Sequence, residues 1–349
     1  MKPQVKVPQI KIPEVKRLLP ADFIAKPELT QKKTAVCIFH MYPPIHNAGA
    51  EIMAHTLNLY LLKKGWKVYV ILPKFPKKEV DGIQIIEFSE TQKIEEVVQR
   101  ASILISHLRY SELTVKTAKE ANKPAVMLIH NSFQIPWIMS FLKIIPKEQL
   151  HFIYNSLWIK NFYKKWEIDG PILYPPVEMK DYEIKTNHKY VTLVNCMDDK
   201  GGEVLVKLAK AMPETQFLGV LGGYGNQIIE KGLPNLKYMK NTPDASKFYS
   251  QTDIILMPSY YESWGRVAVE AMSIGIPVIA HPTPGLKESL GEAGLFADRD
   301  NLDQWIRCIQ RLQSDPWFYG LKSEEGRIRA KQLDPEPQLK ETEAWLKSL

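Results

Sequence analysis

Cysteine and long hydrophobic runs are both scarce in this sequence. Its 349 residues contain only Cys37, Cys196 and Cys308, an odd number of scattered thiols that argues against a disulfide framework and a cysteine-based zinc site. No run of about 18 apolar residues occurs, so we expect no membrane-spanning helix. The first residues also lack the apolar segment of a secretory signal. These absences together predict a cytoplasmic protein.

Positive charge is scarce outside the first 33 residues. The formal net charge is +7. Residues 1–33 hold eight Lys or Arg and three Asp or Glu side chains, so they carry +5 and leave +2 for the rest of the chain. A nearly neutral body lacks the basic stripe that binding to a phosphate backbone requires, which disfavours nucleic acid as a partner.

Residues 1–33 also carry a proline-containing repeat with a period of five, around Pro8 and Pro13. A proline at every fifth residue forbids a helix and favours an extended chain. We therefore expect residues 1–33 to form a solvated, disordered basic tail. The alternative is a tether that adds a strand to a partner or docks on an anionic surface.

The remaining length suits two domains of about 150 residues each. Apolar runs of strand length alternate with helical segments in two series, residues 34–177 and residues 189–330, with the polar segment 178–188 as the linker. Such alternation predicts two doubly wound α/β domains with parallel sheets and ligand sites at the carboxyl ends of the strands. We expect residues 331–349 to form a C-terminal helix that packs back on the N-terminal domain.

The segment from Glu262 to Glu270 carries the clearest chemical signal. It follows an expected strand and opens a helix whose first backbone N–H groups, with Gly265 among them, suit a diphosphate. Carboxylates on either side of such an anion site would accept hydrogen bonds from hydroxyls, which a sugar and a ribose supply. The alternative is a pair of solvated glutamates on a helix surface.

This part of the chain resembles the donor-binding core of the retaining glycosyltransferases of family 4. The matching motifs are Pro258–Ser263, Glu270–Met272, Gly275–Ala280 and Gly285–Glu288. The resemblance covers residues 34 to about 330 and is stronger in the C-terminal half. It implies the GT-B fold, in which two Rossmann-like domains face each other across a cleft. It also implies that Glu262 contacts donor-sugar hydroxyls, that Glu270 binds the nucleotide ribose, and that the backbone of Ser263, Trp264 and Gly265 holds the diphosphate.

One expected cation of the donor site is missing. The resemblance assigns Lys200 to the diphosphate, but Asn195 stands where the family usually has an arginine. We hypothesise that Arg266, inside the phosphate-binding turn, supplies this charge, because its planar, permanently charged guanidinium can donate several hydrogen bonds to a phosphate. The alternative is that Arg266 points to solvent.

Other positions of the donor site follow from the same resemblance. Gly49 and Ala50 stand where the family often has two glycines, and small residues there let the backbone approach the β-phosphate. His130 matches a family histidine beside the donor sugar, although a histidine at a strand end is often merely structural. Gly223 and Tyr238 are expected to line the nucleotide pocket.

The implied reaction is transfer of a hexose or related sugar, with retention of configuration, from a nucleoside-diphosphate sugar to a hydroxyl. A UDP-sugar is the expected donor, and a glycan or lipid-linked glycan is the expected acceptor. A protein hydroxyl and a hydroxylated DNA base are the alternatives. His130, Lys200, Glu262 and Arg266 are the candidate catalytic residues, and no cofactor or metal is expected.

Two other classes of protein stay open at this point. The glycine-rich segment 222–225, with Asp244 about twenty residues later, permits an NAD-binding dehydrogenase, although its glycine spacing does not fit the full dinucleotide fingerprint. The departures at Asn195 and Ala50 permit an inactive module that only binds a sugar nucleotide.

An apolar stripe at helical spacing lies in the N-terminal half. It consists of Trp137, Ile138, Phe141, Leu142 and Ile145. Such a stripe is typical of a buried core. Otherwise it would line an acceptor cleft or make a peripheral contact with a membrane surface.

Overall fold

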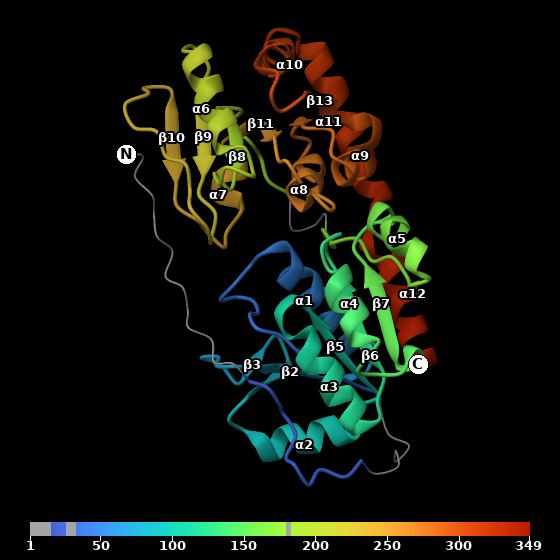
Figure 1. The fold of residues 1–349 in the computed structure, drawn as a ribbon. Coiled ribbons are helices and arrows are strands. Elements are labelled where there is room, and N and C mark those ends of the chain that lie inside the picture. The colour runs from blue at the N-terminus through green and yellow to red at the C-terminus, as the bar shows by residue number, and fades with distance from the viewer. Residues whose placement is uncertain (1–14, 26–32, 179–182) are drawn as a thin grey trace. The chain divides into compact units, whose positions relative to one another are not determined.

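The computed structural model describes residues 15–25, 33–178 and 183–349. They form two compact α/β units (Figure 1). The C-terminal unit is Val177–Asp334, and the N-terminal unit consists of the described residues up to Pro176 together with Pro335–Leu349. The chain therefore returns to its N-terminal unit for its last helix.

The sheet of the N-terminal unit has the strand order β3-β4-β2-β1-β5-β6-β7. Neighbouring strands are parallel, except that β3 pairs antiparallel with β4. The strands are β1 (Thr34–Ile38), β2 (Lys67–Leu72), β3 (Glu79–Val80), β4 (Ile83–Glu87), β5 (Ile103–His107), β6 (Ala125–Ile129) and β7 (Leu150–Tyr154). Every residue of β1, β5 and β6 is buried, as expected for parallel strands covered on both faces.

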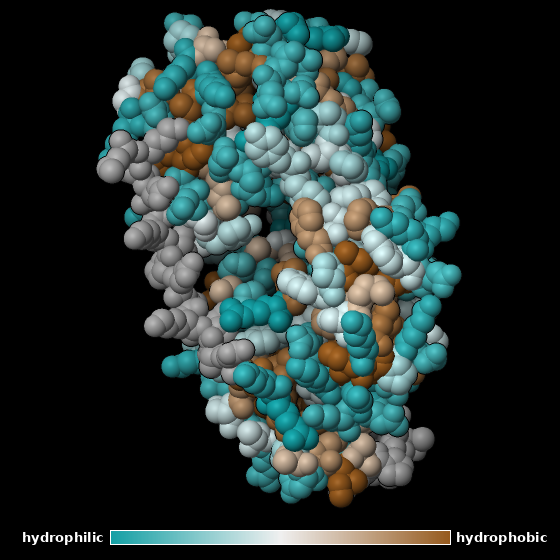
Figure 2. Space-filling model, viewed as in Figure 1, coloured by the Kyte–Doolittle hydropathy of each residue, from teal (hydrophilic) through white to brown (hydrophobic). Residues whose placement is uncertain are grey.

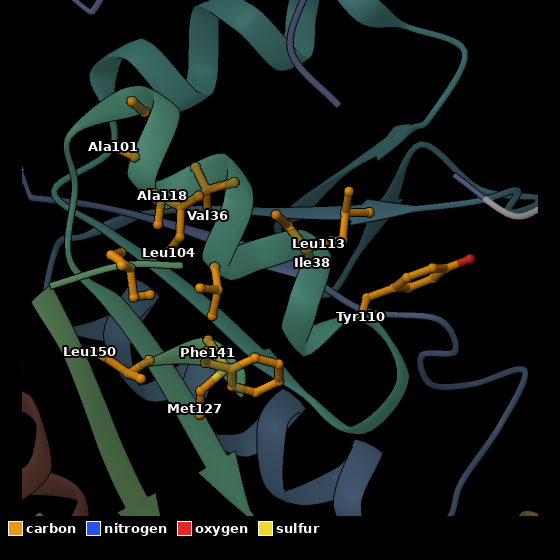
Figure 3. Close-up of a cluster of buried hydrophobic side chains, with 14 of the residues drawn as sticks. Val36, Ile38, Ala101, Leu104, Tyr110, Leu113, Ala118, Met127, Phe141 and Leu150 are labelled. Atoms are coloured by element: carbon orange, nitrogen blue, oxygen red, sulfur yellow. The ribbon is translucent and has the colours of Figure 1, made fainter. Parts of the chain in front are cut away.

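Helices cover both faces of this sheet. They are α1 (Gly49–Lys63), α2 (Thr91–Arg100), α3 (Ser111–Ala121), α4 (Ile135–Phe141), α5 (Leu157–Tyr163) and α12 (Pro335–Ser348), with 3-10 turns at Leu108–Tyr110, Lys147–Gln149 and Lys164–Trp166. Alternate residues of β1 enter different core clusters: Val36 and Ile38 point to one face, and Ala35 and Cys37 to the other. Figure 3 shows the first cluster, where Val36 and Ile38 lie near side chains of α3.

Helix α12 packs on the N-terminal unit through its apolar side. Leu339 and Leu346 are buried in the same core cluster as residues of α1. The indole Nε1 of Trp66 donates to the carboxylate of Glu343 at 2.9 Å. The backbone N–H of Tyr174 donates to the Gln338 side chain at 2.8 Å, so polar contacts flank the apolar ones.

Part of the basic tail is not solvated. Within residues 15–25, Leu18 and Leu19 are buried in the core cluster on the α3 side, and Val15 and Phe23 pack against it. The expectation of a solvated, disordered tail is therefore wrong for this segment, because burying its apolar side chains in the cluster removes them from water. The expectation for residues 1–14 and 26–32 falls outside the described residues.

The sheet of the C-terminal unit is parallel and has the strand order β10-β9-β8-β11-β12-β13. Its strands are β8 (Tyr190–Val194), β9 (Phe217–Val220), β10 (Leu236–Met239), β11 (Thr252–Met257), β12 (Val278–Ala280) and β13 (Leu295–Phe296). Its helices are α6 (Gly202–Ala211), α7 (Ser246–Tyr249), α8 (Arg266–Ile274), α9 (Pro284–Leu290), α10 (Leu302–Ser314) and α11 (Pro316–Gln332), with a 3-10 turn at Gly291–Ala293. Trp305 of α10 and Phe318 of α11 are buried in the core of this unit with residues of α6.

Each sheet has a point at which its winding direction reverses. In the N-terminal unit β1 lies between β2 and β5, and in the C-terminal unit β8 lies between β9 and β11. At the carboxyl ends of β1 and β5, and of β8 and β11, the following loops run in opposite directions along the sheet. The space between two such loops is where α/β proteins bind ligands. The loops after β1 and β5 and the loops after β8 and β11 are therefore the places to search for function.

The apolar stripe on and after α4 is mostly core. Ile138, Phe141 and Ile145 are buried, and Leu142 packs against them. Trp137 is instead 51% exposed. Figure 2 shows apolar residues at the surface around α4 and β7 of the N-terminal unit. None of the described helices is long and apolar enough to cross a bilayer.

Candidate functional site

Two loops of the C-terminal unit meet at its switch point. One follows β8 and the other follows β11, and the N–H of Tyr260 donates to the carbonyl of Asp199 at 2.9 Å. A Cβ atom at Gly201 would lie 2.1 Å from Cγ of Pro258, so the two loops approach more closely than a side chain at this position would allow.

An ion pair joins these two loops. Nζ of Lys200 donates to Oε1 of Glu262 at 2.6 Å, and the hydroxyl of Ser259 donates to the same oxygen at 3.0 Å. The side chains of Lys200 and Glu262 are 22% and 16% exposed. Burial alone would lower the pKa of Lys200, but the charge and hydrogen bond of Glu262 hold it above its usual value. The crevice thus contains a fixed ammonium group beside a carboxylate.

Helix α8 begins immediately after the second loop. Gly265 precedes it in the left-handed region with φ of 91°, and a Cβ there would lie 2.5 Å from Cδ2 of Leu286. A Cβ at Gly285, at the start of α9, would lie 2.3 Å from the carbonyl oxygen of Glu262. Glycine is therefore needed at both positions, and the first turn of α8 follows directly after Gly265.

Glu270 lies just over one turn into α8 and is almost completely buried. Its side chain is 6% exposed, its Oε1 forms an ion pair with the guanidinium of Arg266, and its Oε2 accepts from the hydroxyl of Tyr249 at 2.8 Å. The Arg266 side chain is only 21% exposed. The alternative that Arg266 points freely into solvent is therefore wrong, and each of the paired glutamates has a basic partner.

Asn195 has a structural role in the loop after β8. It adopts φ of 70°, and its Oδ1 accepts from the N–H of Met197 at 3.3 Å and from Nε2 of Gln227 at 3.2 Å. Asparagine tolerates the left-handed region better than arginine does. Asn195 thus shapes the turn that leads to Lys200 and contributes no charge.

Gly223 and Tyr238 belong to the β9 side of the sheet. Gly222, beside Gly223, donates its N–H to Gln227 Oε1 at 2.8 Å, which ties this loop to the Asn195 turn. The Tyr238 hydroxyl accepts from the N–H of Glu230 at 3.0 Å. Tyr238 lies on β10, two strands from β8, whereas Gly223 follows β9, the neighbour of β8.

The glycine-rich segment 222–225 lacks the context of a dinucleotide fingerprint. That motif must open a helix directly after its strand. Here the residues after Gly225 form a bridge and irregular chain, and β10 comes before the next helix. Asp244, the candidate ribose-binding acid, instead accepts from the N–H of Ser246 at 3.1 Å. The local structure therefore does not support a dehydrogenase.

The switch point of the N-terminal unit carries several histidines. His40 follows β1, His107 ends β5, and His130 follows β6. The rings of His107 and His130 lie 5.2 Å apart between centroids in an edge-to-face arrangement. Glu51, in the first turn of α1, is buried and lies 3.4 Å from Nδ1 of His46. Gly49 and Ala50 form the helix start that precedes this carboxylate.

Burial keeps two of these histidines neutral. It lowers the pKa of His107 to about 4 and that of His130 to about 3. Neither ring nitrogen of His107, nor Nε2 of His130, has a hydrogen-bond partner among the residues that the structure describes. Buried polar atoms are rarely left in this condition. The pair therefore combines neutral rings with buried nitrogens that have no partner in the described part of the chain.

The pKa values of Glu51 and His46 are shifted in opposite directions. Burial would raise the pKa of Glu51, but the hydrogen bond with His46, the charges of His107 and His46 and a backbone hydrogen bond together outweigh it, and the pKa falls to about 2. The hydrogen bond between His46 and Glu51 raises the pKa of His46. In the described part of the chain, no three His, Cys, Asp or Glu side chains are grouped to hold a metal ion.

Several residues of these two groups were missed by reasoning from sequence. They are His40, Glu51, His107 and Tyr249. His107 could have been found by the same rule as His130, since each stands at the end of an apolar strand. The contact of Tyr249 with Glu270 joins two elements that are 21 residues apart, and no local pattern marks it.

Residues 176–332 match a protein-family model described as "Glycosyl transferases group 1". This range coincides closely with the C-terminal unit and includes the Lys200–Glu262 pair and α8. The family match thus covers the unit in which the candidate donor residues lie.

Curated relatives match the chain over shorter stretches. The O-antigen chain mannosyltransferase B of Escherichia coli is 33% identical over 112 residues, which are 31% of this chain and 29% of that protein. A D-inositol 3-phosphate glycosyltransferase of Arthrobacter sp. (strain FB24) is 36% identical over 135 residues, which are 34% of this chain and 32% of that protein. The chain thus spans about a third of the length of these relatives.

Solved structures resemble the chain over nearly its whole length. Sucrose-phosphate synthase from Thermosynechococcus elongatus has a TM-score of 0.73 at 18% identity, covering 91% of this chain and 99% of that chain. Anabaena HepE in complex with UDP-glucose has a TM-score of 0.73 at 15% identity, covering 90% and 100%. At such identities the likeness shows the fold alone, and the prediction of a GT-B fold is confirmed.

Proposed function

We propose that this chain is a glycosyltransferase that moves a sugar from a nucleoside-diphosphate sugar to a hydroxyl acceptor. The observation that carries the proposal is the crevice between β8 and β11. There a lysine and a glutamate from different loops meet directly in front of the start of α8. The match of residues 176–332 to the glycosyltransferase model supports the same reading.

The diphosphate would bind where positive charge gathers. Lys200, the guanidinium of Arg266 and the N-terminus of α8 would hold its oxygens. Lys200 and Arg266 are each paired with a carboxylate. When the diphosphate binds, its oxygens would replace Glu262 as the partner of Lys200 and Glu270 as the partner of Arg266. Both carboxylates would then be released to accept hydrogen bonds from hydroxyl groups.

The released carboxylates would recognise the rest of the donor. Glu262, at the mouth of the crevice, would accept hydrogen bonds from sugar hydroxyls, and Glu270, deeper and held by Tyr249, would accept from the ribose. Arg266 would supply the charge that Asn195 does not. We propose UDP as the nucleotide.

The chemistry proposed is loss of the nucleoside diphosphate with retention of configuration at the sugar. The bond from the anomeric carbon to the diphosphate oxygen breaks, the bond from that carbon to the acceptor oxygen forms, and the proton of the acceptor hydroxyl passes to the departing diphosphate. Lys200, Arg266 and the N–H groups of α8 would stabilise the charge on the leaving group, which makes a metal unnecessary. His130, neutral through burial, would act by hydrogen bonding rather than by charge.

The acceptor proposed is a hydroxyl of a glycan or a lipid-linked glycan. One curated relative is named for an O-antigen chain and another for an inositol phosphate, and both substrates present sugar-like hydroxyls. The neutral imidazoles of His107 and His130 suit hydroxyl groups of this kind, because a neutral ring offers one donor and one acceptor.

Titration calorimetry with UDP and with GDP tests the donor half of this proposal. The wild type should bind one of them, and Glu270→Gln should bind it at least tenfold more weakly. Glu214→Gln, an exposed glutamate before β9, is the matched control and should leave affinity unchanged. Unchanged affinity in Glu270→Gln would remove Glu270 from the ribose site.

A screen of nucleotide sugars with mass spectrometry of the products tests the chemical half. Transfer to a glycan acceptor, or slow hydrolysis of the donor, would support an enzyme. Tight nucleotide binding without either reaction would instead support the inactive binding module.

A further inference from the structure

Arg299 is a buried arginine that contacts both loops of the candidate donor site. It lies between β13 and α10 and is 5% exposed. Its Nη1 donates to the carbonyl of Pro258, after β11, and to that of Asp199 at 3.5 Å. Its Nη2 donates to the carbonyl of Asp198, after β8, at 2.6 Å. The guanidinium lies 3.5 Å from the ring centroid of Tyr260.

These contacts flank the residues that would bind the donor. Asp198 and Asp199 directly precede Lys200, and Tyr260 precedes Glu262 by two residues. The backbone N–H of Arg299 donates to Nδ1 of His281, after β12, at 3.0 Å, so the arginine itself is anchored. One guanidinium thus fixes two loops that belong to neighbouring strands.

We propose that Arg299 is a positioning residue that holds Lys200 and Glu262 in the geometry required to bind a nucleoside diphosphate. This inference rests on the proposed function. Its physical basis is the planar guanidinium of arginine, whose N–H groups have fixed directions and can donate to carbonyls of two loops at once. A lysine at this position would keep the charge but could not satisfy both loops.

The competing explanation is that Arg299 contributes only to the stability of the unit. A buried guanidinium is costly to leave unpaired, and so are the carbonyls it serves. Loss of Arg299 would then lower the melting temperature without a specific effect on the donor. The two explanations differ in where flexibility appears and in whether nucleotide affinity changes.

Arg329 provides a matched control. It also donates to two backbone carbonyls, those of Ser289 at 3.1 Å and Glu288 at 2.7 Å. Those carbonyls belong to the end of α9 rather than to the loops after β8 and β11. Arg329→Met should therefore remove the same kind of interaction without releasing Lys200 or Glu262.

The first experiment measures UDP and GDP affinity by titration calorimetry in the wild type, Arg299→Met, Arg299→Lys and Arg329→Met. Both Arg299 variants should bind the preferred nucleotide at least tenfold more weakly, whereas Arg329→Met should bind it as the wild type does. Wild-type affinity in a folded Arg299 variant would overturn the positioning role alone. Absence of binding by the wild type would overturn the proposed function and this role with it.

The second experiment is amide hydrogen exchange, which does not depend on any ligand and applies even if Arg299→Met does not fold. Arg299→Lys should exchange faster in residues 198–202 and in residues 258–265. Arg329→Met should exchange faster only near the end of α9. Unchanged protection of both loops in Arg299→Lys would contradict the proposal.

Discussion

Nζ of Lys200 and Oε1 of Glu262 lie 2.6 Å apart although 62 residues separate them in the chain. The pair forms because β8 and β11 are neighbours in the sheet, so the loops at their carboxyl ends share one crevice. A lysine and a carboxylate in such a position neutralise each other, and under the proposed function a diphosphate would replace Glu262 beside Lys200 while sugar hydroxyls would replace Lys200 beside Glu262. The first prediction follows from this exchange.

Glu262→Gln and Lys200→Met should have opposite effects on binding of UDP. Glu262→Gln removes the negative charge that pairs with Lys200, so UDP affinity should stay equal or rise, while sugar transfer falls by about 100-fold because the donor sugar loses a charged acceptor of hydrogen bonds. Lys200→Met should lower UDP affinity by about tenfold or more. Calorimetry and initial rates measure both effects. A parallel loss of UDP affinity in the two variants would show that Glu262 does not compete with the diphosphate.

Arg266→Met should lower UDP affinity about tenfold or more, because Arg266 is proposed to supply the charge that Asn195 lacks. Arg266→Lys should recover part of this affinity, since an ammonium keeps the charge but loses the planar fork. Glu270→Gln in the Arg266→Met background separates the direct effect from the loss of the ion pair. If Arg266→Met binds UDP normally, another group must neutralise the diphosphate.

Gly265→Ala should lower both stability and nucleotide affinity. An alanine at φ of 91° is strained by about 1–2 kcal/mol, and its Cβ would lie 2.5 Å from Leu286. Gly65→Ala is the matched control, because Gly65 has φ of 87° but no atom within 4 Å of its added Cβ. Melting temperatures should fall in both variants, and UDP affinity only in Gly265→Ala. Equal affinity in both variants would mean that the start of α8 does not bind the diphosphate.

Acid should destabilise the N-terminal unit through its buried histidines. The pKa values of His107 and His130 are about 4 and about 3, below the ordinary 6.5. At pH values between the folded pKa and 6.5, the unfolded chain therefore binds more protons than the folded chain does. The free energy of unfolding should therefore fall as the pH drops from about 6.5 toward 4. The raised pKa of His46 acts in a higher pH window, because its stabilisation is fully present below about pH 6.5 and is lost as the pH rises through the folded value.

Urea unfolding at several pH values measures this dependence. His107→Asn cannot take up the proton, so its unfolding free energy should fall less steeply with acid than that of the wild type. An equally steep fall in His107→Asn would show that other groups cause the acid sensitivity.

Much of the fold could be predicted because its signals are local. Apolar runs such as Ala125–Ile129 and helix stops such as Gly65 depend only on neighbouring residues, and alternation of strands with helices specifies a doubly wound sheet. Strand β10 was not expected, because Leu236–Met239 is short and half polar. The packing of Leu18 and Leu19 was also missed, since prolines in the tail indicate extended chain but not where that chain lies.

The sequence by itself determined the α/β architecture, the helix that opens after Gly265 and the identity of the two glutamates that α8 and its preceding loop carry. Only the tertiary structure decided that Glu262 meets Lys200 and that Arg299 holds both of their loops. It also brought His107 against His130. These contacts depend on the order of strands in the sheet, which sets the neighbours at each carboxyl end and which no local pattern of residues encodes.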